Sequence, residues 1–418
     1  MGGMPKSATH THVIGGGLAG LSASLTLLDA GHDVTLYEAG PACGGRCRSY
    51  FDATLGCRID NGNHLLLAGN QAAAAYLDRI GARDTMTGPA TPAIPFVDLR
   101  TGRSWTLRPN RGRIPFWLLS KARRVPGTSW RDYLPLRRLS QSRPTDTVAG
   151  SFPDGPLYRR FVEPFAVSAL NTPAISGSAR LLGAVIDETL LRGGEACTPL
   201  VPRCGLSESF IDPAVAALQA GGAAIRMSSR IGSLTILQDR VAALTGPQGP
   251  VLLGRTDCVV VATPPWVTGE LLPAVNVPNE FQSILNLHFQ VEAKPGEAGF
   301  YGLVGGVSEW IFVKRGIVSV TVSAANRLID RTSEDLVATI WPEVRLVLDL
   351  PEQLPPWRVV KEKRATFAAT PAQQLRRPTA TTMWPNCTLA GDWIDTGLPA
   401  TIEGAIRSGV TAARALAS

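Results

Sequence analysis

A glycine-rich stretch near the start of the chain most constrains its fold. Residues 15–20 read Gly-Gly-Gly-Leu-Ala-Gly, a G-x-G-x-x-G pattern that follows the apolar run Val13-Ile14 and precedes the helix-like run 21–28. The first glycine of such a pattern permits a tight strand-to-helix turn, the second lets the backbone approach a pyrophosphate, and the third lets helix and strand pack closely. The N–H groups at the start of the helix then face the phosphates. The stretch therefore predicts a dinucleotide site.

The residues after the glycines support this interpretation. Gly31-His32 reads as the next turn, residues 34–37 read as a second strand, and Glu38 ends that strand. A carboxylate about twenty residues past the glycines binds ribose hydroxyls, and it disfavours the 2′-phosphate of NADP. A glycine-rich turn alone occurs in many α/β proteins. It is this context that favours a Rossmann-like nucleotide-binding domain.

The chain has 418 residues and is too long for one ordinary core. Buried-strand and helix patterns of the nucleotide-binding kind occur in three places, and two stretches with other patterns interrupt them. We expect an α/β fold in which residues 1–85, 200–265 and 381–418 build the nucleotide-binding domain. Residues 86–199 and 266–380 are expected to build an inserted α+β substrate domain.

The composition is that of a soluble globular protein, with 44% hydrophobic and 18% charged residues. The stretch Met1–Thr11 is polar and small, so no secretory signal is expected. No run of about 18 uncharged apolar residues predicts a membrane-spanning helix. The seven cysteines lack metal-ligand spacing, which favours reduced thiols in a cytoplasmic protein without a metal site.

The positive charge of the chain is concentrated in one segment. Residues 100–143 hold twelve Arg or Lys and one acid, a net +11, so the remainder of a chain with +7 in total carries −4. Apolar and aromatic residues alternate with the basic ones, as at residues 114–119 and at Trp130. This pattern is typical of an element that lies on an anionic membrane surface. Nucleic acid is not expected as a partner because no nucleic-acid-binding motif accompanies the segment, and a solvated basic face is the alternative.

The order of motifs along the chain resembles that of the flavin amine oxidase and phytoene desaturase superfamily. Residues 15–20 with Glu38 are followed by Gly44-Gly45-Arg46 and by a strand end at 259–265 that reads Val-Val-Val-Ala-Thr-Pro-Pro. A late Ala-Gly-Asp then precedes Ile-Glu-Gly-Ala at 402–405. The pattern spans nearly the whole chain. It implies FAD as the cofactor and a glutathione-reductase-type nucleotide-binding domain.

Two further motifs narrow the resemblance. Residues 60–67, with Asp-Asn-Gly and His64, and residues 169–173, Ala-Leu-Asn-Thr-Pro, are similar to those of the hydroxysqualene dehydroxylases. This implies an FAD-dependent oxidoreductase of bacterial squalene or hopanoid biosynthesis. Its reaction would be the reductive removal of the hydroxyl of hydroxysqualene to give squalene, with squalene-pathway synthases upstream. A carotenoid-type desaturase or saturase, and a non-catalytic isoprenoid-binding protein on the same fold, are the alternatives.

The resemblance assigns the cofactor site residue by residue. The first glycines would hold the pyrophosphate, Glu38 the adenosine ribose and Arg46 the ribityl side, and the start of the last helix would face the negative charge of the flavin. The residues expected at the cofactor are Gly15, Gly17, Leu18, Ala19, Gly20, Glu38, Ala39, Gly44, Gly45, Arg46, Asn61, Gly62, Ile231, Gly391, Asp392, Ala400, Thr401 and Ile402. Cys43 and Cys47 flank the second glycine pair, where packing is expected rather than a thioether to the flavin.

The implied reaction needs one proton donor and a dry apolar tunnel, because the allylic hydroxyl leaves as water before hydride arrives from reduced flavin. His64 is the first candidate donor, since its motif leads toward the cofactor, and a structural histidine is the alternative. Asp60, Glu163 and Asp395 are further candidates. For Asp60 and Glu163 the alternative is a turn cap or an ion pair, because buried acids need partners.

Overall fold

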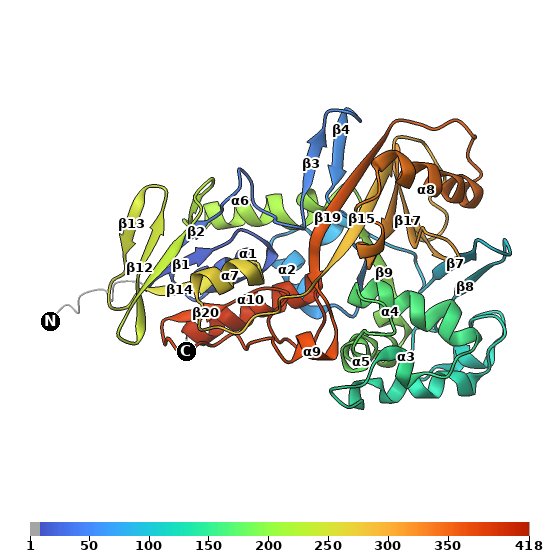
Figure 1. The fold of residues 1–418 in the computed structure, drawn as a ribbon, viewed down its shortest axis with the longest axis horizontal. Helices are drawn as coiled ribbons and strands as arrows, with labels where there is room; N and C mark the ends of the chain where they lie inside the picture. Colours follow the sequence, from blue (N-terminus) through green and yellow to red (C-terminus); the bar gives the residue numbers. More distant parts are fainter. Residues whose placement is uncertain (1–8, 418) are drawn as a thin grey trace.

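The computed structural model describes residues 9–417, and a parallel sheet forms its first layer (Figure 1). This five-stranded sheet has the order β10-β2-β1-β14-β20 and all of its pairs are parallel. Its strands are β1 (His10–Ile14), β2 (Asp33–Tyr37), β10 (Ala224–Arg226), β14 (Cys258–Val261) and β20 (Cys387–Leu389). Because β1 lies between β2 and β14, the strand order reverses there, and ligands of α/β sheets bind beyond the carboxyl ends at such a point. Most of the polar N-terminal stretch, residues 1–8, lies outside the described residues.

Helix α1 (Leu18–Asp29) connects β1 to β2 as in a β-α-β unit. Nine of its twelve residues are buried, because it packs against α10 (Ile402–Ala417) and α6 (Asp212–Ala220) as well as against the sheet. Helix α10 also packs on α2 (Gln71–Arg79). A helix that is buried on most of its sides must be enclosed by other elements, and α1 is enclosed in this way.

A mixed seven-stranded sheet forms the second layer, with the order β19-β15-β18-β17-β16-β7-β8. Only β16 and β7 pair in parallel; the other neighbours are antiparallel. Its strands are β7 (Ile94–Asp98), β8 (Ser104–Leu107), β15 (Phe281–Phe289), β16 (Phe300–Val304), β17 (Trp310–Lys314), β18 (Ile317–Val322) and β19 (Trp357–Phe367). Helix α8 (Ser333–Leu348) covers one face over a separate hydrophobic core.

The faces of β15 differ in character. Leu285, Leu287 and Phe289 belong to the core under α8. Successive residues of a strand point to opposite faces, so Asn286 and His288 point away from α8. On that face Asn286 contacts residues 61 and 63. The second sheet thus presents a polar strip toward the nucleotide-binding layer.

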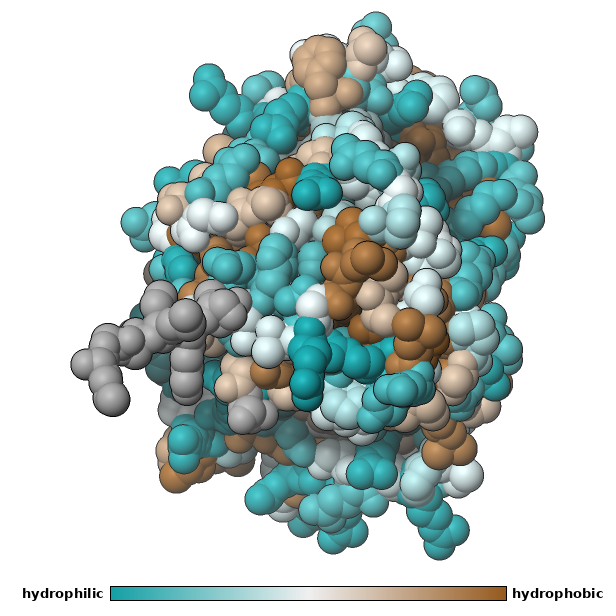
Figure 2. Space-filling view, turned by 90° about the vertical axis from the view of Figure 1, so that its left-hand side faces the viewer, coloured by the Kyte–Doolittle hydropathy of each residue, from teal (hydrophilic) through white to brown (hydrophobic). Residues whose placement is uncertain are grey.

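Shorter elements complete the fold. The hairpin β3 (Ser49–Asp52) and β4 (Cys57–Asp60) lies against β15 and β19 through Gln290, which donates to the Leu55 carbonyl, and Arg358, which pairs with Asp52. The remaining elements are β5 (Leu66–Leu67), β6 (Met86–Thr87), β9 (Pro199–Pro202), β11 (Ser233–Leu237), β12 (Arg240–Gly246), β13 (Gly249–Leu252), α3 (Val148–Ser151), α4 (Glu163–Leu170), α5 (Ala179–Glu188), α7 (Pro265–Leu271) and α9 (Pro371–Gln374). The end of the molecule that carries β12 and β13 is largely hydrophilic, with separate hydrophobic patches (Figure 2).

The expected α/β fold with a Rossmann-like domain is confirmed. The strand expected at residues 34–37 lies within β2, and the helix-like run 21–28 lies within α1. A π-helical turn, Tyr158–Val162, precedes α4. The domain boundaries at 85, 199, 265 and 380 stay predictions. None of the helices within residues 9–417 has the length and hydrophobicity needed to cross a bilayer.

The close approach of α1 and α10 depends on Gly409. A Cβ at this position would lie 2.2 Å from the carbonyl oxygen of Ala19 and 2.9 Å from the backbone nitrogen of Ala23. Gly409→Ala is therefore expected to push the helices apart and to lower the free energy of unfolding by about 1–3 kcal/mol. Gly155→Ala is the control, because a Cβ there meets no atom within 4 Å. Chemical denaturation compares the two variants, and equal midpoints would contradict the close approach.

Candidate active site

The glycine-rich turn after β1 is closely packed at two glycines and open at a third. Gly15 has φ +111°, and a Cβ there would lie 2.5 Å from the carbonyl oxygen of Ala262. A Cβ on Gly20 would lie 1.9 Å from the carbonyl oxygen of Gly15, whereas one on Gly17 would meet no atom within 4 Å. Helix α1 has no side-chain cap and no acid in its first turn, so its first N–H groups are left for an anion beside Gly17.

A second glycine pair lies against this turn. The backbone N–H of Gly44 donates to the carbonyl oxygen of Gly16 over 2.8 Å, and Gly44 and Gly45 both have positive φ, +118° and +56°. The position of a Cβ on Gly45 is 3.6 Å from the Cα of Gly17. Two backbone loops therefore meet without side chains between them, next to the open space at Gly17.

Glu38 stands at the end of β2, where the sequence places a ribose-binding carboxylate. Its Oε2 accepts the N–H of Gly16 over 2.8 Å and its Oε1 accepts that of Gly40 over 2.7 Å. These two bonds orient the carboxylate beside the first glycine turn. Ala39 follows on the surface.

The two cysteines near this turn are not reactive. Burial, together with the charge of Glu38, raises the pKa of the Cys43 thiol to about 12. Burial likewise raises the pKa of Cys47. Since the thiolate is the nucleophile, both cysteines stay unreactive at neutral pH, which favours packing over a thioether.

Arg46 joins three segments that are far apart in sequence. Its Nη2 donates to Oδ1 of Asp392 over 2.7 Å, and its Nη1 donates to the carbonyl oxygen of Ala365. Asp392 follows Gly391, whose N–H donates to the Ser408 hydroxyl on α10 over 2.8 Å. The guanidinium thus holds β19 and the chain after β20 against the second glycine pair.

The start of α10 keeps its positive end available. The Thr401 hydroxyl accepts the N–H of Gly404 over 3.0 Å, as a helix cap does. The first-turn acid, Glu403, is 1% exposed, and its carboxylate accepts the N–H groups of Ala72 and Ala73 and a bond from Arg407. Because these partners neutralise Glu403, the helix start at Ile402 still favours a negative group beside its first N–H groups.

Residues 61–63 are fastened to the polar face of the seven-stranded sheet. The amide of Asn286, which is 1% exposed, donates to the carbonyl oxygen of Asn61 over 3.3 Å and accepts the N–H of Asn63 over 3.4 Å. The hydroxyl of Thr321 donates to Asn286 over 2.8 Å and accepts from the Asn63 amide over 3.0 Å. A Cβ on Gly62 would lie 3.1 Å from the Asn286 nitrogen, so a larger residue would require the Asn286 amide to shift by a few tenths of an ångström.

The carboxylate of Asp60 is occupied by protein partners. Lys314 on β17 donates to Oδ2 over 2.6 Å, while the Ser49 hydroxyl and the Leu206 N–H donate to Oδ1 over 2.6 and 2.8 Å. The Asp60 side chain is 6% exposed. The ion pair joins β4 to the second sheet, and an ion pair is the structural alternative anticipated for this residue.

The other acidic candidates lie elsewhere. Asp395 is on a loop with its side chain 43% exposed, and it accepts bonds from Gln374 and from the N–H of Gly397, each over 3.2 Å. Glu163 is the first residue of α4, and burial raises its carboxyl pKa. The structure does not bring either residue into the hydrogen-bonded group formed by residues 60–63.

His64 follows that group and is neutral. Burial lowers the pKa of its imidazole to about 4, against the opposing charge of Asp60 and with the help of Arg46. No residue among 9–417 forms a side-chain hydrogen bond with His64. A neutral imidazole carries one N–H donor, so His64 can donate a hydrogen bond to a ligand without being an imidazolium.

Aromatic residues adjoin the polar turn. Trp310 on β17 is the cross-strand partner of Thr321, so the two side chains share a face of the sheet. Phe96 lies 5.7 Å from Trp310, 5.6 Å from Trp105 and 6.4 Å from Phe161, measured between ring centroids. An apolar cluster that could contact a lipid therefore begins one residue pair away from the Asn63–Asn286 network.

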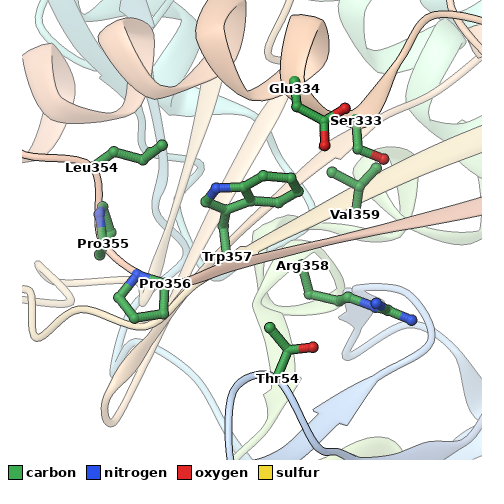
Figure 3. A pocket seen from close by; sticks show the side chains of 9 residues that line it. All are labelled: Thr54, Ser333, Glu334, Leu354, Pro355, Pro356, Trp357, Arg358 and Val359. Atoms are coloured by element: carbon green, nitrogen blue, oxygen red, sulfur yellow. The ribbon is translucent and has the colours of Figure 1, made fainter.

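Two hollows lie outside this group. Ile231, expected at the adenine end, is 5% exposed and lines a small hollow of about 20 Å³ beside β2 and β10. A larger hollow of about 610 Å³ lies at the outer end of β19, where Trp357 stands between α8 and the hairpin residue Thr54 (Figure 3). It contains none of the predicted site residues, so its size does not make it the site.

Four contributors to the site carry no signal in the local sequence. They are Lys314, Asn286, Thr321 and the carbonyl group of Ala365. All lie on strands of the second sheet, within residues 266–380, for which the sequence predicts only an inserted substrate domain. The alternation of apolar and polar residues from Leu285 to Phe289 is the one pattern that could have indicated Asn286.

An extended dinucleotide fits this arrangement. Its phosphates match the open backbone at Gly17 and the start of α1, a ribose matches Glu38, and a ring system that becomes negative on reduction matches the start of α10. These are the requirements of FAD, and the class defined by the fold and the site is the FAD-dependent oxidoreductases.

Comparison with known proteins agrees. Residues 18–417 match the family described as flavin containing amine oxidoreductase. Hydroxysqualene dehydroxylase of Rhodopseudomonas palustris is 47% identical over 96% of this chain and 97% of its own, and that of Zymomonas mobilis is 45% identical over 96% and 98%. The chain belongs to the flavin-containing amine oxidoreductases and, among them, to the hydroxysqualene dehydroxylase family. The expected FAD cofactor and oxidoreductase class are thereby confirmed.

The wider similarities are of two kinds. An oxidoreductase structure from Methanosarcina mazei has 14% identity and a TM-score of 0.73 over 96% of this chain and 99% of its own, which shows a shared fold. A zeta-carotene desaturase of Synechococcus elongatus is 36% identical but matches only 18% of this chain and 15% of its own. The likeness to desaturases is therefore partial.

The buried ion pair between Asp60 and Lys314 predicts a large, coupled effect on stability. Asp60→Ala is expected to lower the free energy of unfolding by about 3–5 kcal/mol, because it leaves a mostly buried ammonium unpaired. In a double-mutant cycle, Lys314→Met should lower the free energy of unfolding much less in the Asp60→Ala background than in the unaltered protein. The exposed pair Arg79–Asp29 is the control, with a coupling below about 1 kcal/mol. Additive losses at Asp60 and Lys314, measured by chemical denaturation, would contradict the pairing.

Proposed function

We propose that this protein removes the hydroxyl group of hydroxysqualene by reduction and releases squalene, within bacterial squalene and hopanoid biosynthesis. The observation that carries the proposal is the similarity to hydroxysqualene dehydroxylases over nearly the full length of both chains. The aromatic cluster beside residues 61–64 supports an apolar substrate.

The reaction replaces a C–O bond with a C–H bond. One hydride and one proton enter, and water leaves. When bound, reduced FAD supplies the hydride. The tasks left for the protein are to bind the dinucleotide, to exclude water, to orient the lipid and to hold a proton donor at the hydroxyl oxygen.

The dinucleotide would be held mainly by backbone groups. In this proposal Gly15, Gly17, Leu18, Ala19 and Gly20 bind the pyrophosphate, Glu38 and Ala39 the adenosine ribose, and Ile231 the adenine end. The remaining assigned residues face the ribityl chain and the ring: Gly44, Gly45, Arg46, Asn61, Gly62, Gly391, Asp392, Ala400, Thr401 and Ile402. Three observations support these assignments: the open backbone at Gly17, the uncapped start of α1, and the Arg46–Asp392 pair.

We assign the proton donor to His64. Its imidazole directly follows the Asn63–Asn286 network, and no side-chain hydrogen bond within the described chain involves it. As a neutral group it would pass its N–H proton to the leaving hydroxyl while its other ring nitrogen takes up a proton from solvent, so that the imidazole ends the step neutral. Asp60 would be a positioning residue that holds β4 and the turn after it, and Asp395 is the second candidate donor, from the exposed loop.

We further propose that the protein works from the cytoplasm at the inner face of the cell membrane. A substrate of this kind dissolves in the bilayer, and the basic segment 100–143 would be attracted to anionic lipids. Squalene-pathway synthases would supply the substrate there.

The proposed activity is tested by anaerobic incubation of the purified holoprotein with dithionite and hydroxysqualene. Squalene is the expected product, detected by gas chromatography with mass spectrometry. Phytoene offered under oxidising conditions is the comparison substrate, because it tests the desaturase alternative. Turnover of phytoene with hydroxysqualene left intact would overturn the proposal.

The donor role of His64 predicts a specific loss. His64→Ala should lower kcat by about a hundredfold and leave the flavin absorbance spectrum in place. Because the imidazole has a pKa of about 4, turnover of the unaltered enzyme should persist from about pH 5 to 8. An imidazolium donor with an ordinary pKa would instead lose activity as the pH rises through about 6.5. Asp395→Asn is the matched variant: a loss there, with none in His64→Ala, would move the donor role to Asp395.

A further inference from the structure

We propose that the turn at residues 114–119 inserts into an anionic bilayer. Ile114, Phe116 and Leu119, here called the docking wedge, would enter the apolar region of the lipid, while basic side chains around them bind lipid phosphates. The inference deepens the proposed membrane location by naming the element that makes contact, and it rests on that part of the proposed function.

Exposed apolar side chains gather in this part of the molecule. Ile114, Phe116 and Leu119 are 63%, 62% and 69% exposed, and Trp130 and Leu134 are 45% and 47% exposed. Five of the fourteen exposed large apolar side chains of residues 9–417 thus fall between residues 114 and 134. Single exposed apolar residues are normal on a soluble protein, but a concentrated group marks an interaction surface.

The docking wedge is held from behind by buried contacts. Trp117 is 4% exposed and packs edge-on against Tyr133 with ring centroids 5.4 Å apart. The Tyr133 hydroxyl accepts the N–H of Val125 over 3.0 Å, and Arg124 donates to the carbonyl oxygen of Leu118 over 2.6 Å. These contacts fix the inner side of the turn, so the outward orientation of the wedge is part of the fold.

Unpaired cations surround the docking wedge. Arg111, Arg113, Lys121 and Arg123 are exposed, and none of the described acids forms a salt bridge with them. Each basic residue near an anionic membrane adds roughly a factor of five to the binding constant, the equivalent of about 1 kcal/mol. Arg124 and Arg111 differ, because their guanidinium groups donate to the carbonyl oxygens of Leu118 and Ala90. The cations available for lipid are therefore Arg113, Lys121 and Arg123.

A bilayer can bind both the apolar docking wedge and the basic residues around it. Nucleic acid would pair with the cations but leave the docking wedge in water, and a second copy of this chain would have to supply acids from a matching patch. An anionic membrane offers phosphates at the level of the cations and hydrocarbon beneath them. The segment lies at the end of the molecule away from β12 and β13, at the lower right of Figure 1, so it can reach a membrane without obstruction from the nucleotide-binding sheet.

The test measures co-sedimentation of the full-length holoprotein with vesicles. One set contains equal parts phosphatidylglycerol and phosphatidylcholine, and the other contains phosphatidylcholine alone. Phe116→Ser with Leu119→Ser should weaken binding to the anionic vesicles more than about tenfold. Lys121→Glu with Arg123→Glu should remove the preference for anionic vesicles.

Matched controls come from other surfaces. Leu252→Ser replaces an 80% exposed leucine on β13, and Arg255→Glu with Arg315→Glu reverses two exposed arginines elsewhere. Both should bind vesicles as the unaltered protein does. All variants change exposed side chains, and equal melting temperatures would establish that they are folded.

Two outcomes would overturn the inference. In the first, the Phe116/Leu119 variant binds anionic vesicles as well as the unaltered protein does. In the second, the protein forms a dimer without vesicles that the same variant abolishes, which would make the surface a protein interface. An activity assay with detergent-dispersed hydroxysqualene separates this inference from the proposed reaction. The docking-wedge variant should be as active as the unaltered protein in this assay. An unaltered protein without activity would count against the proposed reaction, but not against membrane docking.

Discussion

The backbone contact between two glycine loops is the constraint on which the rest of the structure depends. At Gly15 and Gly20 the chain passes so close to itself that a single Cβ would collide with a carbonyl group. That closeness places the start of α1 directly beyond β1, and it lets the Gly44 loop lie against the turn. A dinucleotide site results because peptide groups, rather than side chains, face the open space beside Gly17.

The second sheet contributes what the nucleotide-binding layer lacks. Asn286 and Thr321 hold residues 61–63 by three hydrogen bonds and are joined to each other by a fourth, and Lys314 holds Asp60 by an ion pair. The turn before His64 is thus supported from the sheet that also carries Trp310 and the aromatic cluster. The same sheet positions the polar turn at residues 61–63 and the aromatic cluster beside it. This arrangement suits a reaction at one hydroxyl group of a long hydrocarbon.

The nucleotide-binding half could be predicted from the sequence because its determinants are local. Gly15, Gly17, Gly20 and Glu38 occur at fixed spacings, and each spacing follows from the geometry of one turn. The partners of Asp60 could not be predicted in the same way. Lys314 lies 254 residues later on an antiparallel strand, and no local pattern encodes a pairing that depends on how two sheets meet. The sequence left two roles open for Asp60, a proton donor or an ion-pair partner. Its saturation by Ser49, Leu206 and Lys314, which favours the second role, appears only in three dimensions.

The contacts of Arg46 have a consequence for the order of folding. Its partners Ala365 and Asp392 lie 319 and 346 residues later in the chain. Contacts between residues so far apart in sequence require the closure of a long loop, which opposes their early formation. We therefore expect the short-range contact between Gly15 and Gly20 to form before the group around the Arg46 guanidinium does.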